Sequence, residues 1–375
     1  MSKARSTLQA FVEECTDCGI CIQSDCASRG HLPLTSREIF EQVLTGNPSA
    51  AVKEFIARCA LCGLCSVECP VKLDVSRAVM AASQMLLASG ATKLEDYSLM
   101  LVDRDVHLFT INRDTYDIHY DDLKKERCDT IFFPGCTLNA YAPELTRAAY
   151  GWLEEHEGPV GLSDECCGLS LMHIGLAERA EHFAARLTAQ FANTGATRVV
   201  TACSNCYYYL NETVQDVEIV SLYDLMDAHH FQIHGEEVLT VHDSCPDRSG
   251  QIGAALRHVL AGTHLVEMPH HGASTCCCGS GGIVSMVDPD LCTERARARL
   301  AEFEQTRADK CVTACVSCAY RLARGSTRPC VAHLLELAFA IRVDYDQVHA
   351  RAEAMWEGEW GEYHRARLAG AKVAS

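Results

Sequence analysis

The sequence predicts an α-helical module at the amino terminus, followed by two tandem α/β domains related by pseudo-twofold symmetry. Three observations predict this fold class: two cysteine runs lie among helix-type apolar stripes, a stretch of roughly 110 residues occurs twice, and strand-type and helix-type segments alternate within each copy. We expect the helical module in residues 1–90, a linker in 91–129, the repeated domains in 130–235 and 236–345, and a helical tail in 346–375.

Composition and charge restrict the possible functions. The 375 residues are 48% hydrophobic and 22% charged, which is typical of a soluble globular protein. The net charge of −17 disfavours nucleic acid and anionic membrane surfaces as partners. Residues 1–9 lack the apolar core of a signal peptide, and no stretch reaches the roughly 18 apolar residues of a membrane helix. We therefore expect a cytoplasmic protein without a membrane span, which a partner could hold at the inner face of a membrane.

The chain contains 23 cysteines, and their spacing indicates metal binding. A reducing compartment keeps thiols free, so a disulfide framework is disfavoured and clustered cysteines usually bind metal. Two cysteine runs open the chain. The first consists of Cys15, Cys18, Cys21 and Cys26, and the second of Cys59, Cys62, Cys65 and Cys69. The second run has the full pattern C-x2-C-x2-C-x3-C-P. Three thiolates at this spacing hold a cubane [4Fe-4S] cluster, and the fourth cysteine of each run reaches the other cluster.

We therefore assign one cysteine from the opposite run to each of two cubane clusters. The first set is Cys15, Cys18, Cys21 and Cys69, and the second is Cys59, Cys62, Cys65 and Cys26. The first run departs from the pattern, because four residues rather than three separate Cys21 from Cys26, and Ala27 stands in place of the usual proline. A zinc site is the alternative, but zinc knuckles bring cysteine pairs from separated turns and do not need three cysteines in seven residues.

Helical segments surround both cysteine runs. Residues 36–44 place Ile39, Phe40, Val43 and Leu44 at helical spacing, and residues 75–87 are again helical in character. A helical ferredoxin module that ends near Gly90 fits this pattern better than a small β-rich module.

The rest of the chain is an internal repeat. Three features occur in both copies. Cys136 corresponds to Cys245, and the CCG at 166–168 corresponds to the CCG at 277–279. The cysteine pair that begins at Cys203 corresponds to the pair that begins at Cys315. The offsets are nearly constant, at 109, 111 and 112 residues. A strand-type run precedes the first and last cysteines of each copy, and we expect loops at the ends of parallel strands to bring the cysteines to one rim of each sheet.

Each copy offers five candidate metal ligands. They are Cys136, Cys166, Cys167, Cys203 and Cys206 in the first copy, and Cys245, Cys277, Cys278, Cys315 and Cys318 in the second. Adjacent cysteines do not close an unstrained disulfide easily, which favours a metal cluster over a redox disulfide.

The duplicated C-x(n)-C-C-G-x(n)-C-x-x-C pattern resembles the cysteine-rich domains of heterodisulfide reductase catalytic subunits. With the amino-terminal ferredoxin module, the chain resembles the fused, D-type subunit of that enzyme. The layout is also similar to the iron–sulfur subunits of anaerobic glycerol-3-phosphate, glycolate and lactate dehydrogenases. The resemblance implies a noncubane [4Fe-4S] cluster bound by the five cysteines of each copy, with two such clusters facing a disulfide substrate; these ten cysteines would be catalytic. The interval between Cys136 and Cys166 is slightly shorter than its counterpart, which could reshape the first site.

Other residues near these patterns invite weaker assignments. His242, His270 and His271 are candidate proton donors because they lie nearest to the predicted site, although core or surface histidines are commoner. We interpret Gly279-Ser-Gly-Gly282 as tight backbone packed against a cluster, since no phosphate-loop lysine follows it. Five cysteines fall outside the ligand sets and are expected to be small buried hydrophobic residues: Cys128, Cys276, Cys292, Cys311 and Cys330.

Two functions compete. The first is a heterodisulfide-reductase-like oxidoreductase that reduces a small disulfide, and the second is a carrier subunit that passes electrons from a flavoprotein dehydrogenase to a membrane quinone or cytochrome partner. No G-x-G-x-x-G fingerprint for flavin or nicotinamide occurs in the chain, so the two-electron cofactor is expected on another subunit. A redox-sensing or cluster-storage protein is a third possibility that no specific feature supports.

Overall fold

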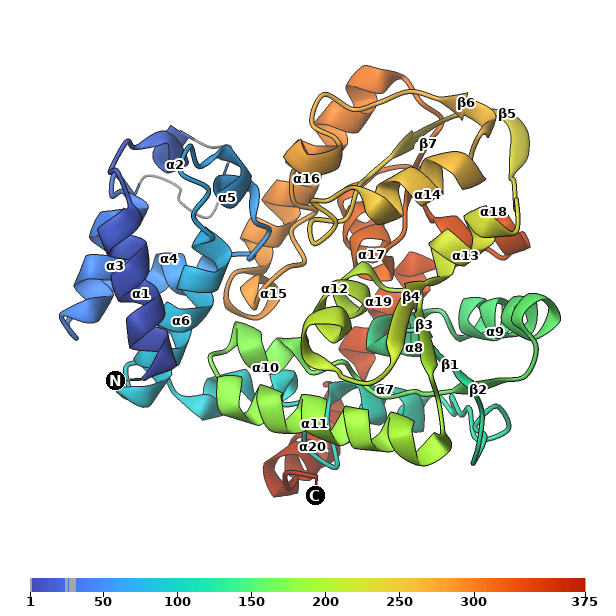
Figure 1. Ribbon diagram of the computed structural model, residues 1–375, viewed down its shortest axis with the longest axis horizontal. Coiled ribbons are helices and arrows are strands. Elements are labelled where there is room, and N and C mark those ends of the chain that lie inside the picture. The colour runs from blue at the N-terminus through green and yellow to red at the C-terminus, as the bar shows by residue number, and fades with distance from the viewer. Residues whose placement is uncertain (1, 24–25, 27–31, 375) are drawn as a thin grey trace.

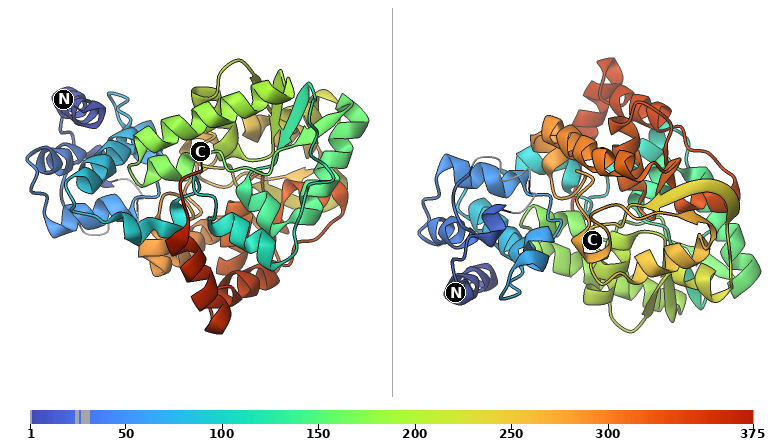
Figure 2. Two further views of the ribbon diagram at one scale, coloured as in Figure 1. Left: turned by 90° about the horizontal axis from the view of Figure 1, so that it is seen from below. Right: turned by 90° about the horizontal axis from the view of Figure 1, so that it is seen from above.

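A computed structural model describes residues 2–23, 26 and 32–374. A helical region is followed by two four-stranded parallel sheets, each with its own helices, as the sequence predicts (Figure 1). The predicted fold class is therefore confirmed. The helical region lies to one side of the two sheets, and its second half faces helices of the carboxy-terminal sheet domain (Figures 1 and 2).

The amino-terminal module is built from six helices: α1 (Lys3–Glu14), α2 (Ile20–Gln23), α3 (Ser36–Leu44), α4 (Ala50–Arg58), α5 (Leu64–Glu68) and α6 (Val75–Ala88). The predicted helix over residues 36–44 is α3, and the one over 75–87 is α6. Thr35 begins α3 with a capping box, because its side chain accepts from the Glu38 backbone N–H while Glu38 accepts from the Thr35 N–H. Leu8, Ile39 and Phe40 are among the side chains that form the core between α1, α3 and α6.

The first sheet has the strand order β2-β1-β3-β4, and all its pairs are parallel. Its strands are β1 (Thr130–Phe133), β2 (Val160–Leu162), β3 (Arg198–Thr201) and β4 (Glu218–Ser221), and its helices are α8 (Cys136–Tyr141), α9 (Pro143–Glu157), α10 (Leu169–His173), α11 (Ala177–Thr194), α12 (Ser204–Thr213) and α13 (Leu222–Ala228). Strand β1 is buried at every residue, as expected for a parallel sheet covered by helices on both faces.

The second sheet repeats this order as β6-β5-β7-β8, again with parallel pairs. Its elements are β5 (His234–Val241), α14 (Gln251–Val259), β6 (Gly262–Leu265), η2 (Gly272–Ser274), α15 (Val284–Val287), α16 (Pro289–Thr306), β7 (Lys310–Thr313), α17 (Val316–Gly325), β8 (Val331–His333) and α18 (Leu334–Phe339). One hydrophobic core contains residues of both sheets, such as Phe132 and Val241, so the two copies pack as a pair.

The segment between the module and the first sheet contains η1 (Leu94–Met100) and α7 (Leu108–Thr115). Tyr97, Leu101 and Val102 of this segment are buried in the core of the first copy. The chain ends in α19 (Tyr345–Ala354) and α20 (Gly358–Gly370), and Met355 and Leu368 pack with Ile111 of α7. Among the described residues, no helix combines the length and the apolar character that crossing a membrane requires.

Candidate metal centres

The first cysteine run and Cys69 meet at one end of the helical module. Cys15, Cys18, Cys21 and Cys69 all line one small cavity. Burial raises the pKa of the Cys15 thiol, and the nearby Cys21 and Cys69 raise it further because a second thiolate would repel its charge. The structure thus brings together the four cysteines assigned to the first cubane cluster.

The second set also combines the two runs. Burial raises the pKa of the Cys59 thiol to about 12, and the neighbouring Cys26 and Cys62 thiols add to this effect. Cys26 therefore lies beside Cys59, although most of the loop around it, including Ala27, is outside the described residues. Cys65, which we assign to the second set, lines the cavity of the first set. Thiols collected in this way fit a pair of cubane clusters, and Cys69 and Cys26 each lie near cysteines of the opposite run.

In the first cysteine-rich domain, the five candidate ligands form a continuous chain of thiols. Cys136 begins α8 after β1, Cys166 and Cys167 follow β2, and Cys203 and Cys206 begin α12 after β3. All five therefore lie past the carboxyl ends of parallel strands, at the predicted rim. Their thiols are hydrogen-bonded in sequence, from Cys136 to Cys166 (3.6 Å) and on through Cys167 and Cys206 to Cys203.

The second copy repeats this chain of thiols. Cys245 is hydrogen-bonded to Cys277, Cys277 to Cys278, Cys278 to Cys318 (3.1 Å) and Cys318 to Cys315. In both copies the second cysteine of the CCG has a lowered pKa because neighbouring thiols donate hydrogen bonds to it: that of Cys167 is about 6, and that of Cys278 lies well below its ordinary value. Cys277 and Cys315 of the second copy also have lowered pKa values because neighbouring thiols donate hydrogen bonds to them. Five converging thiols, at least one of which has a lowered pKa in each copy, suit a thiolate-bound metal cluster.

The structure explains why each CCG ends in glycine. Gly168 and Gly279 have φ angles of +89° and +99°, in the region that only glycine adopts readily. A Cβ on Gly168 would lie 2.7 Å from the Phe183 ring, and one on Gly279 would lie 2.6 Å from the Cys292 carbonyl oxygen. Each glycine therefore lets the chain turn sharply after the paired cysteines while it packs against the following long helix.

The two cysteine-rich sites face each other across the interface between the copies. The Ser317 hydroxyl, between Cys315 and Cys318, lies 3.4 Å from the Thr137 hydroxyl, which follows Cys136. Tyr223 is fully buried, and its O–H is shared between the carbonyl oxygens of Ala202 (2.8 Å) and Ala314 (3.0 Å). Ala202 and Ala314 directly precede the cysteine pair of each copy, so one phenol links equivalent points of the two sites.

The second site also abuts the helical module. The Cys62 thiol is hydrogen-bonded to the Cys277 thiol, and Arg248 donates to the Cys62 carbonyl oxygen from Nη2 (2.6 Å) and Nε (3.1 Å). The glycine-rich loop after the second CCG presses against the same segment, because a Cβ on Gly281 would lie 2.1 Å from the Ala60 carbonyl oxygen. The interpretation of this loop as tight backbone agrees with these contacts.

The first copy meets the module at another place. A Cβ on Gly175, which follows α10, would lie 2.5 Å from the Gln84 backbone nitrogen in α6. Gln84 lies in the second half of α6, after the last cysteine of the module. The two copies therefore have the same internal arrangement of thiols but different relations to the first two cysteine sets.

The remaining candidates divide into buried and exposed residues. His242 is 1% exposed beside Cys278 and Cys318, and burial together with the Arg299 guanidinium lowers its pKa to about 3, so the ring is neutral. His270 and His271 are not fully buried, and His270 pairs with Glu302 (3.2 Å). Cys292, Cys311 and Cys330 are buried as expected, whereas Cys128 and Cys276 are only partly buried.

Sequence reasoning missed three residues that the structure places at these sites: Arg248, Arg299 and Tyr223. Arg299 carried a usable signal, because it shares a helical stripe with the apolar Ala296, Leu300 and Phe303 and must therefore be buried. Tyr223 carried none, since its partners are carbonyl groups that only the packing of the two copies brings together.

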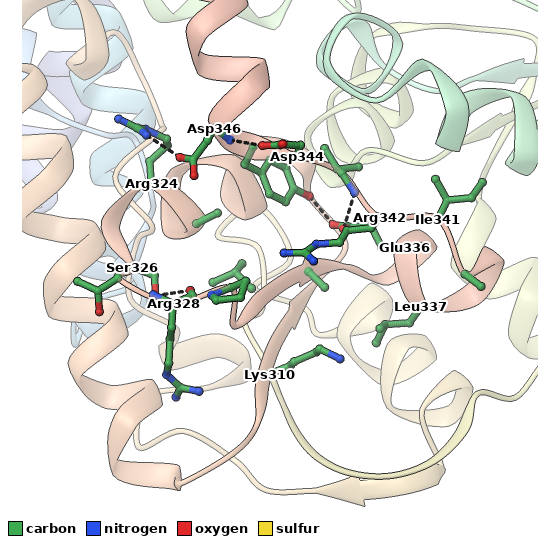
Figure 3. Close-up of a pocket in the computed structure, with 18 residues that line it drawn as sticks. Lys310, Arg324, Ser326, Arg328, Glu336, Leu337, Ile341, Arg342, Asp344 and Asp346 are labelled. Atoms are coloured by element: carbon green, nitrogen blue, oxygen red, sulfur yellow. Dashed lines mark hydrogen bonds and ion pairs between the residues drawn. The ribbon is translucent and has the colours of Figure 1, made fainter.

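A cavity of about 780 Å³ lies away from the cysteines (Figure 3). Its walls include Lys310 at the start of β7 and Val331 at the start of β8, which lie at the amino edge of the second sheet. Arg324, which also lines it, is paired with Asp346 at 2.8 Å. Because the thiols occupy the opposite edge, this cavity is not the redox site.

Two family models match the chain. Residues 14–74 match the 4Fe-4S dicluster domain, and residues 130–211 and 239–323 each match the cysteine-rich domain named CCG. Together the models cover more than half of the chain. The protein is thus an iron–sulfur electron-transfer protein that combines a ferredoxin-type dicluster domain with a duplicated CCG domain. The dicluster match supports two cubane clusters.

Curated relatives are distant and belong to several systems. An uncharacterized iron–sulfur protein of Methanocaldococcus jannaschii is 23% identical over 74% of this chain, and the match spans 59% of that relative's length. The D-type subunit of the dihydromethanophenazine:CoB–CoM heterodisulfide reductase of Methanosarcina barkeri is 23% identical, covering 73% of each chain. The glycolate oxidase iron–sulfur subunit of Escherichia coli is 22% identical, covering 88% of this chain and 93% of its own.

A solved structure supports the fold. The crystal structure of a hypothetical protein from Helicobacter pylori superposes with a TM-score of 0.54 at 11% identity, covering 93% of this chain and 75% of the other. At this identity the likeness concerns the fold alone.

Proposed function

We propose that this chain conducts electrons from its dicluster domain to a pair of CCG sites, where a disulfide bound between the two sites is reduced. The observation that carries this proposal is the contact between the Cys62 and Cys277 thiols. It places a cysteine assigned to the second cubane cluster against a cysteine of the second CCG site. The clusters, when bound, supply single electrons over a wide range of potentials.

The geometry supports a set of ligands for each cluster. We propose that Cys15, Cys18, Cys21 and Cys69 hold the first cubane cluster, that Cys59, Cys62, Cys65 and Cys26 hold the second, and that the five thiols of each CCG copy hold a noncubane [4Fe-4S] cluster. Electrons would then reach the second CCG copy first, because its thiols adjoin the module. Cys18, the exposed cysteine of the first set, marks the end at which a donor would dock.

The chain's own residues would position the disulfide. The two thiol chains face each other, and Tyr223, Ser317 and Thr137 fix their separation. Reduction of a disulfide consumes two electrons and two protons and yields two thiols. Two facing sites suit this stoichiometry, since each can interact with one sulfur. The heterodisulfide reductase chain among the relatives supports this assignment.

The test uses the holoprotein, purified anaerobically. It should contain about sixteen irons per chain and should reduce an organic disulfide with a viologen as electron donor. Zinc in place of iron would overturn the ligand sets. A full iron content without disulfide turnover would leave the clusters in place and exclude the reductase.

A second candidate is a carrier subunit that passes electrons from a flavoprotein dehydrogenase to a membrane quinone or cytochrome partner at the inner membrane face. The glycolate oxidase iron–sulfur subunit supports it, because that match spans nearly all of both chains. The absence of a G-x-G-x-x-G fingerprint also fits a flavin on another subunit. Co-purification with a flavoprotein that reduces the clusters, without disulfide turnover, would favour the carrier.

A further inference from the structure

A buried histidine–arginine pair lies behind the thiols of the second CCG copy. His242 directly follows β5 and Arg299 belongs to α16, and each is 1% exposed. The Arg299 Nε–H donates to His242 Nδ1 at 3.0 Å. Because a guanidinium has only donors, Nδ1 must accept, and the proton of the neutral ring must be on Nε2. The structure therefore fixes the tautomer of His242.

The Nε2–H of His242 has no hydrogen-bond partner among the described residues, and the ring lies beside two cysteines. A ring nitrogen of His242 and the Sγ atoms of Cys278 and Cys318 lie within 4.8 Å of one another. Nδ1 is already occupied by Arg299, and Nε2 is a buried atom without a hydrogen-bond partner among the described residues. A buried N–H without a partner is costly, so this donor indicates an acceptor at the site of the thiols.

Arg299 is itself held in place. Its Nη1 donates to the His270 carbonyl oxygen at 2.7 Å and to a Glu302 carboxylate oxygen at 2.8 Å. Its Nη2 lies 3.4 Å from the Thr275 hydroxyl, which donates to the Asp243 carbonyl oxygen at 3.1 Å. This network leaves the guanidinium little freedom, and Glu302 balances its charge inside the protein.

The first copy lacks this pair. At the offsets of the repeat, 109 and 112 residues, the counterparts of His242 and Arg299 are Phe133 and Leu187. Both are fully buried in one apolar cluster. The two copies thus present the same five thiols, but a histidine–arginine pair lies behind the second set, whereas apolar side chains take the corresponding places in the first.

We propose that His242 donates its Nε2–H to a sulfur of the second CCG cluster, that Arg299 positions this donor, and that the bond makes the second cluster easier to reduce than the first. This inference rests on the proposed function, since it requires a cluster in each copy. A donor to sulfur stabilises the added negative charge of the reduced state, and hydrogen bonds to the sulfurs help to set cluster potentials. The copy beside the dicluster domain would therefore accept an electron before the other.

The bond can be detected in the unmodified holoprotein. Pulsed electron paramagnetic resonance of protein containing 15N-histidine should show a histidine nitrogen and an exchangeable proton coupled to the second-copy signal, which is identified by its loss in Cys278→Ser. The proton coupling should disappear in deuterated buffer. A second-copy signal without either coupling would overturn the proposal, whatever the behaviour of the variants.

Variants measure the effect on potential. The double variant His242→Phe with Arg299→Leu gives the second copy the side chains of the first. We expect the equilibrium constant for one-electron reduction of the second cluster to fall about tenfold, or about 59 mV, with the other signals unchanged. His242→Gln, which retains an acceptor for Arg299 and an N–H donor, should recover part of the shift. Leu187→Met in the first copy is the control and should leave the second-copy potential unchanged.

The outcomes separate the two proposals. An unchanged second-copy potential in the double variant at full iron content would overturn the role of His242 while the clusters remain. Absence of any second-copy signal from the unmodified protein, with low iron, would overturn cluster binding itself. If the double variant fails to take up iron, the labelled unmodified protein still decides.

Discussion

In the second CCG copy, Cys277 contacts Cys62 of the dicluster domain and His242 backs the thiols, whereas in the first copy the corresponding space is filled by Phe133 and Leu187. The strand order and the chain of five thiols are the same in both. The comparison teaches that the two copies share the rim of five thiols, while the residues behind and beside the rim differ. Under the proposed function, the second copy receives the electrons and the first is reached through it.

The largest effect should come from removing a thiol that belongs to one copy. Cys277→Ser should abolish the second-copy signal and block reduction of the first copy by the dicluster domain, because Cys277 joins the two regions. The matched variant Cys166→Ser should abolish only the first-copy signal. Freeze-quenched electron paramagnetic resonance after rapid reduction measures the signals of both copies. Normal reduction of the first copy in Cys277→Ser would contradict the proposed order.

The glycine-rich loop after the second CCG gives a second, steric test. Gly281→Ala should weaken the contact between the dicluster domain and the second copy by about 1–3 kcal/mol, because its Cβ would lie 2.1 Å from the Ala60 carbonyl oxygen. We expect slower electron transfer to the second copy with an unchanged iron content, measured by stopped-flow absorbance. Gly151→Ala, where a Cβ meets nothing within 4 Å, is the control and should transfer electrons at the normal rate.

A third test compares ion pairs at the amino edges of the two sheets. Arg198 of β3 pairs with the partly buried Glu157 at 2.7 Å, whereas its counterpart Lys310 of β7 pairs with the exposed Glu237. Glu157→Gln should cost about 1–3 kcal/mol of unfolding free energy, and Glu237→Gln less than about 1 kcal/mol. Equal shifts of the two melting temperatures would contradict this difference in burial.

The Glu157 pair also predicts a pH dependence. Burial alone would raise the pKa of Glu157, but hydrogen bonds from His229 and Arg198 outweigh it and hold the pKa below its ordinary value. A lowered folded-state pKa means that the stabilisation is complete above the unfolded value of about 4.3 and is lost as the pH falls through the folded value. The difference in unfolding free energy between the wild-type protein and Glu157→Gln, measured by thermal unfolding, should therefore become smaller as the pH falls below about 4.

The smallest expected effect on the cluster signals concerns the link between the copies. Tyr223→Phe removes an O–H shared by two buried carbonyl groups and should cost about 1–3 kcal/mol without loss of iron. Because Ala202 and Ala314 precede the cysteine pairs, we expect small changes in both CCG signals at once. A change confined to one copy would show that Tyr223 does not couple them.

The sequence by itself determined the fold class, the repeat and the collection of thiols at strand ends. Spacing was sufficient for this, because period-2 and period-3.6 patterns specify local elements and parallel strands bring their carboxyl ends to one edge. The helices at residues 36–44 and 75–87 appear almost as predicted. The roles of individual cysteines as cluster ligands remain predictions.

Only the tertiary structure decided which copy adjoins the dicluster domain and what lies behind each set of thiols. The contacts of Cys62 with Cys277, of Arg299 with His242 and of Tyr223 with Ala314 join residues that are far apart in the chain. No local periodicity encodes such pairs, because they arise from the way whole domains pack. A sequence can therefore specify two equivalent sites, while the surrounding packing makes them unequal.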